Sequence, residues 1–74
     1  MFDKKDLIKL AKMKMPFGKY GGRALIDLPE EYLLWFAKKG FPEGQLGYLL
    51  KLSLEMHIHG LTDIIKPIKK MNIE

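Results

Sequence analysis

The sequence predicts a small α+β domain in which a β-hairpin packs on about three α-helices. Two segments show amphipathic helical spacing with capping residues, and a third, at 43–59, is apolar nearly all round. Between the first two lies a stretch, 15–25, that contains one proline and three glycines. Such residues break a helix but suit a tight turn between two short strands. We expect a single domain over 1–74, with its core over 13–68.

The first expected helix extends from an N-cap at Asp3 to about Met13. Asp3 is a favourable cap because its carboxylate accepts hydrogen bonds from the N–H groups of the first turn. Leu7, Leu10 and Ala11 share one face at helical spacing, whereas lysines occupy most of the other faces. This pattern predicts a modestly amphipathic helix.

The hairpin is expected to follow directly. Pro16 favours an extended Met15 and prevents a helix from crossing this point. The sequence Tyr-Gly-Gly-Arg at 20–23 suits a two-residue turn with positive φ at its centre, and 24–26 then forms a short return strand. Because two strands alone are marginally stable in water, the ribbon must lie on helices.

The second expected helix has Pro29 in its first turn and ends at Lys39, with Gly40 as its C-cap. Most of its apolar residues form one arc when projected at the helical period. Leu34 and Trp35 fall outside that arc. The helix therefore offers two contact surfaces.

The third helix is expected over 43–59 and ends at Gly60. A helix that is apolar on every side is covered from several directions, so this one should be central. In the tail, Pro67 limits the expectation to a short helical turn before Lys66.

Composition narrows the classes of partner. The chain has 74 residues, a net charge of +4 and no cysteine, so disulfides and thiolate metal sites are excluded. No apolar run reaches the length of a membrane span, and the N-terminus lacks the pattern of a secretory leader. We expect a cytoplasmic protein with no membrane partner and no cofactor. The modest positive charge permits an anionic partner.

Flat rings beside positive charges predict a surface for single-stranded DNA or RNA. In this interpretation Tyr20 stacks on a base, and Lys19 and Arg23 contact phosphates. Further lysines could widen the patch, namely Lys12, Lys14, Lys38 and Lys39. The candidate nucleic-acid-binding residues are Lys19, Tyr20, Arg23, Lys14 and Lys38.

A structural interpretation stays open for the same rings. Phe17 and Tyr20 can anchor the hairpin to the second helix, and for Phe17 this is the interpretation we favour. Trp35 is more often covered by another part of its own fold, here the first helix or the tail. If instead it is uncovered, Leu34 and Trp35 form a partner-binding patch that favours a homodimer.

Catalytic and metal-binding constellations are not evident. His57 and His59 are two residues apart on an expected helix and so face about 160° apart, whereas a shared ion needs a spacing of three or four. His57 is expected to be a core or interface histidine. The glutamates lack an accompanying nucleophile, base and oxyanion site. We therefore expect a protein that is not an enzyme.

Several motifs resemble a small bacterial family labelled "putative quorum-sensing-regulated virulence factor". They are Met-Pro-Phe-Gly-Lys-Tyr at 15–20, Gly22, Leu28-Pro29, Tyr32-Leu33, Trp35 and Gly-Phe-Pro-Glu-Gly at 40–44. The resemblance covers roughly 13–68.

A looser resemblance joins this chain to the C-terminal accessory domain of exonuclease-X-like nucleases. The shared residues are Phe-Gly-Lys at 17–19, Gly22, and the positions of Tyr32, Leu33 and Trp35. This resemblance implies a role beside nucleic acid, although the acidic metal ligands of those nucleases have no counterpart here. We expect a non-catalytic binding module that contacts nucleic acid or a nucleic-acid-processing complex. The alternative is a homodimeric protein-interaction or regulatory module.

Overall fold

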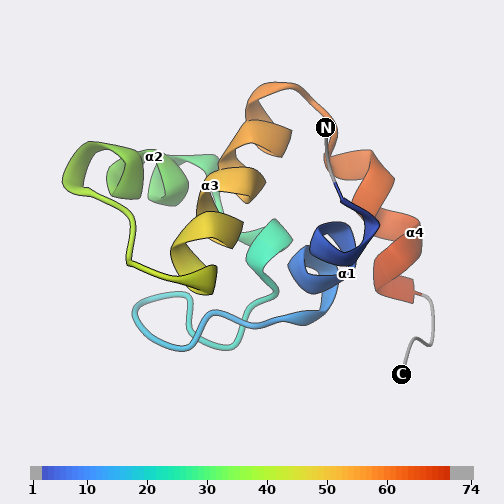
Figure 1. Ribbon diagram of the computed structural model, residues 1–74, viewed down its shortest axis with the longest axis horizontal. Coiled ribbons are helices and arrows are strands. Elements are labelled where there is room, and N and C mark those ends of the chain that lie inside the picture. Colours follow the sequence, from blue (N-terminus) through green and yellow to red (C-terminus); the bar gives the residue numbers. More distant parts are fainter. Residues whose placement is uncertain (1–2, 71–74) are drawn as a thin grey trace.

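The computed structural model describes residues 3–70, apart from the side chains of Lys66, Lys69 and Lys70. Its elements are α1 (Lys4–Lys12), the 3₁₀-helix η1 (Leu25–Asp27), α2 (Glu30–Lys39), α3 (Gln45–Ile58), the 3₁₀-helix η2 (Thr62–Ile64) and α4 (Ile65–Lys70). Figure 1 shows α3 between α2 on one side and the pair α1 and α4 on the other.

Two predicted caps are present, Asp3 at the start of α1 and Gly40 at the end of α2, whereas Pro29, predicted in the first turn of the second helix, is the N-cap residue of α2. Asp3 Oδ1 accepts a hydrogen bond from the backbone N–H of Lys5 at 3.0 Å, and α1 then continues to Lys12. At the end of α2, Gly40 has a φ of +112° and its N–H donates to Phe36 O at 2.6 Å. Local capping chemistry therefore predicted these bounds to within a few residues.

Helix α3 is the central element, as its apolar sequence predicts. It packs against α1, α2 and η1. Its fully or nearly fully buried apolar side chains are Leu49, Leu50, Leu52, Leu54 and Met56. One exposed stripe remains on α3, at Gln45, Tyr48, Lys51, Glu55 and Ile58, so the helix is covered on most but not all of its sides.

Helix α4 packs along α1 and buries Ile65 completely. The prediction of only a helical turn before Lys66 is wrong, because α4 runs through Pro67. Pro67 is the third residue of this helix, where a backbone N–H has no intrahelical partner in any case. The missing N–H therefore costs the helix no hydrogen bond.

The predicted β-hairpin is wrong, and so is the α+β fold class, because residues 3–70 form an all-helical domain. Their one β-pairing is a single antiparallel bridge between Lys14 and Ala24. The backbone N–H of Met15 donates to Arg23 O at 2.8 Å and closes the segment 15–23, here called the glycine loop. Of its two central turn glycines only Gly22 has a positive φ, +92°. The two-residue turns that continue a paired ribbon both need positive φ at the first central residue, which is Gly21 here.

The segment after the glycine loop forms the 3₁₀-helix η1 and not a strand, because three of its side chains are buried together. Leu25, Ile26 and Leu28 are all at most 4% exposed, whereas a strand would turn alternate residues outward. Two side chains of α3 then satisfy its carbonyls. Ser53 Oγ donates to Leu25 O at 3.1 Å, and His57 Nε2 lies 3.1 Å from Ile26 O. Because a carbonyl only accepts, that nitrogen carries the proton. His57, predicted to be a core or interface histidine, is half-buried, and its ring has a partner within the fold.

Candidate functional site

A groove of about 550 Å³ lies between the glycine loop and the first turns of α2. Its volume falls within the roughly 300–1,000 Å³ of typical ligand sites. Aromatic rings dominate its lining, together with one cation and one carboxylate. The lining residues are Phe17, Gly18, Lys19, Tyr20, Pro29, Glu31, Tyr32, Trp35 and Phe36. In Figure 1 the loop and α2 lie away from α1 and α4.

Four rings of the groove lining are linked by edge-to-face contacts and are here called the aromatic row: Tyr20, Tyr32, Phe36 and Trp35. Ring centroids are 4.8 Å apart between Tyr20 and Tyr32, and 5.1 Å apart between Tyr32 and Phe36. The ring centroids of Trp35 and Phe36 are 5.0 Å apart. Phe41, which does not line the groove, stacks on Phe36 with a centroid distance of 6.2 Å. Because Phe36 is buried and joins three of these contacts, the row is anchored in the core.

Two rings at the groove are left open to solvent. Phe17 is 47% exposed and Trp35 is 52% exposed. The interpretation of Phe17 as a core anchor is therefore wrong, and so is the expectation that the first helix or the tail covers Trp35. Tyr20, which is half-buried, holds the glycine loop to Tyr32 instead. Hydrophobic periodicity could not predict the exposure of Phe17, because this residue lies between Pro16 and a glycine, outside any helix.

Two cations gather at the Tyr20 ring. Lys19 Nζ lies 5.6 Å and Arg23 Cζ 5.5 Å from its centroid, both within the range of a cation–π contact. Both side chains are exposed, and neither forms an ion pair with the described part of the chain. The glycine loop therefore presents two positive groups that remain available to an anion.

The structure divides the predicted site residues into two sets. Lys19, Tyr20 and Trp35 line the groove, and Arg23 joins them at the Tyr20 ring. Outside the lining, but still exposed, are Lys14, Lys38 and Leu34. The sequence did not single out Glu31 or Tyr32 as lining residues. One local feature could have indicated them: Glu31 lies four residues and Tyr32 three residues before Trp35, which places all three near one helix face.

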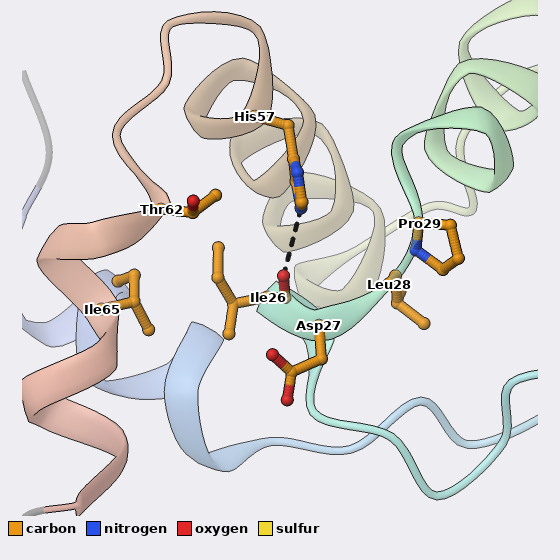
Figure 2. A pocket seen from close by; sticks show the side chains of 7 residues that line it. All are labelled: Ile26, Asp27, Leu28, Pro29, His57, Thr62 and Ile65. Atoms are coloured by element: carbon orange, nitrogen blue, oxygen red, sulfur yellow. Dashed lines mark hydrogen bonds between the residues drawn. The ribbon is translucent and has the colours of Figure 1, made fainter.

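A smaller cavity of about 240 Å³ lies between η1, the C-terminal end of α3 and the start of α4 (Figure 2). His57, Asp27 and Thr62 supply its polar groups. The His57 ring is engaged by the Ile26 carbonyl, and in Figure 2 the Asp27 carboxylate points away from that ring. These groups do not form the hydrogen-bonded nucleophile and base of covalent catalysis.

Two further properties concern residues 3–70 as a whole. Within this range, no three histidine or carboxylate side chains come close enough together to hold a metal ion. None of the helices described has both the length and the apolar character needed to cross a bilayer.

Comparison with known proteins places the chain in a family. Residues 3–68 match the model of a family described as "Putative quorum-sensing-regulated virulence factor". The chain belongs to this family. It is also similar to "Uncharacterized protein YpeB" of Escherichia coli, strains K12 and O157:H7. Each of these relatives is 55% identical over 69 residues, which cover 92% of this chain and 96% of the relative.

No solved structure matches the chain. The family description names neither a ligand nor a reaction. The resemblance to the accessory domain of exonuclease-X-like nucleases is tested by none of these matches and stays a prediction.

Proposed function

We propose that this domain is a non-catalytic module that binds single-stranded DNA or RNA in the groove between the glycine loop and α2. One observation carries the proposal: two half-exposed rings, Phe17 and Trp35, line the same groove as Lys19. Arg23 lies beside that groove, at the Tyr20 ring, and neither cation forms an ion pair with the described residues. Proteins that bind single strands combine ring faces for the bases with positive groups for the backbone. The proposal keeps the cytoplasmic location predicted above.

The roles within the groove follow from exposure. Tyr20 already carries two cations near its ring and is half-buried, so it positions Lys19 and Arg23 for phosphates. We assign the stacking role that the sequence suggested for Tyr20 to Phe17 and Trp35, because about half of each of these side chains is exposed. A ring stacks on a base only where the base is unpaired and unstacked, which favours single strands over duplex.

Fluorescence anisotropy with labelled dT15, rU15 and a 15-base-pair duplex, at two salt concentrations, tests the proposal. The double variant Lys19→Ala with Arg23→Ala should bind dT15 more weakly. It should also lower the slope of log affinity against log salt by about 1.4, since each phosphate contact on a single strand contributes about 0.7. Trp35→Ala should weaken binding by about 1–3 kcal/mol, the cost of one lost base stack.

The matched control is Lys4→Ala with Lys51→Ala, which removes two exposed charges that lie outside the groove. An equal loss of affinity in this control would show only a general attraction to a basic protein. Absence of binding by the wild type, or an unchanged salt slope in the groove variant, would refute the proposal.

A homodimeric interaction module is the second candidate, and one observation favours it. Leu34 and Trp35 are adjacent on α2 and are 45% and 52% exposed. Sedimentation at micromolar concentration decides, with Leu34→Lys as the disrupting variant. A dimer that dissociates in this variant supports the second candidate, whereas a wild-type monomer excludes it. Because Trp35 also lines the groove, such a dimer should compete with oligonucleotide binding.

A further inference from the structure

We propose that Glu31 makes the groove prefer guanine over thymine or uracil in a single strand, an inference that rests on the proposed function. Glu31 supplies the one carboxylate of the groove lining. A negative charge weakens the attraction of a phosphate-binding surface, so its presence there calls for a role beyond affinity. Selection among bases is such a role, because phosphate contacts carry no sequence information.

The placement of Glu31 brings it beside a stacked base. It lies in the first turn of α2, four residues before Trp35, so the two side chains project from the same face of the helix. Glu31 is exposed, and within the described residues its carboxylate has no hydrogen bond or ion pair. A base stacked on Trp35 would therefore present its edge to a free carboxylate.

The chemistry of a carboxylate distinguishes the bases. When ionised it only accepts hydrogen bonds, through two oxygens held side by side. The Watson–Crick edge of guanine offers two adjacent donors, N1–H and the N2 amino group, which match that pair. Cytosine and adenine place an acceptor nitrogen beside their amino group. Thymine and uracil flank their single N3–H with two carbonyl oxygens, which repel the carboxylate.

A purely structural role for Glu31 makes a different prediction. Acidic residues in the first turn of a helix interact favourably with its dipole, and Glu30 is equally placed for this. Only Glu31 lines the groove. Glu30→Gln is therefore a matched control for Glu31→Gln, because both changes remove one exposed charge from the same helical turn.

The test compares three fluorescein-labelled DNA heptamers, all thymine except for guanine, inosine or thymine at the centre. Wild type should bind the guanine heptamer about tenfold more tightly than the all-thymine one, towards the lower end of what a bidentate base contact provides. Inosine, which lacks the N2 amino group, should lie between them. The preference should disappear in Glu31→Gln and persist in Glu30→Gln. The same series in RNA, with uracil as background, asks whether the preference extends to both nucleic acids.

The outcomes separate the two proposals. If no heptamer binds, the proposed function fails and this inference fails with it. If all heptamers bind wild type equally, the groove binds single strands without the selectivity inferred here. A guanine preference that survives Glu31→Gln would show that another group reads the base, and would also overturn the inference.

Discussion

The substitution Gly47→Ala tests how closely α3 packs against the connection that joins it to α2. Gly47 is buried in the first turn of α3. A Cβ at this position would overlap the carbonyl oxygen of Pro42 and lie 2.8 Å from its carbonyl carbon. Both atoms belong to the backbone, so no rotation of a side chain relieves the overlap. Gly47→Ala must instead displace the connection that positions α2 and its groove residues.

The magnitude follows from two opposing effects. In an exposed helix, alanine in place of glycine stabilises by about 1 kcal/mol. Overpacking a filled site costs about 1–3 kcal/mol or more, and a backbone obstacle places this site at or above the top of that range. We expect a net loss of about 2 kcal/mol or more, which lowers the Tm of a domain of this size by at least roughly 8–16 °C. The whole free energy of unfolding of 74 residues is only roughly 4–11 kcal/mol.

Thermal melts followed by circular dichroism measure this effect. Gln45→Ala is the matched control, because Gln45 is exposed in the same first turn and its truncation should leave the Tm unchanged or slightly raised. A Tm of Gly47→Ala equal to or above that of wild type would refute the close approach of Pro42 to α3.

Two further predictions concern single hydrogen bonds. Ser53→Ala removes the side-chain donor of the Leu25 carbonyl, which keeps the backbone N–H of Leu28 at 3.4 Å. The free energy of unfolding should fall by about 0.5–1.5 kcal/mol in urea titrations; an unchanged midpoint would contradict this. The Tyr48 hydroxyl donates to Asp6 Oδ2 at 2.6 Å, and this bond is the main cause that raises the pKa of Tyr48 above its ordinary 10.0. Because the folded state holds that proton more tightly than the unfolded chain, its contribution is complete below pH 10 and is lost as the pH rises through the folded pKa. Melts above about pH 10 should therefore lose less stability in Tyr48→Phe than in wild type, and parallel losses would disprove the linkage.

The helices could be predicted because their signals are local. An N-cap such as Asp3, a C-cap such as Gly40 and an apolar period act within one or two turns, and the structure places α1, α2 and α3 near the predicted bounds. The hairpin prediction failed at Leu25 and Ile26, because short-range turn chemistry competes there with burial. Packing against α3 stabilises a 3₁₀-helix in which both side chains are buried. Hydrogen bonds from Ser53 and His57 to its carbonyls stabilise it further.

The candidate site was predictable in part. Lys19 and Tyr20 were named from residue type and Trp35 from its place outside the apolar arc of its helix, and the groove brings these three together. Exposure was the weak point, since whether Trp35 is covered depends on the path of α1, which packs on α3, and of α4, which packs along α1. Glu31 gave no sign of its place in the groove, because a glutamate in a first helical turn already has an ordinary explanation.

By itself, the sequence determined the capped helices, the central position of α3 and the family, since each depends on neighbours along the chain or on residue identity. Packing between distant segments, by contrast, sets the path of the glycine loop and brings Phe17, Trp35 and Glu31 to one groove. The reason is physical: capping and periodicity are short-range, whereas the burial of a side chain is decided by whichever distant segment packs against it.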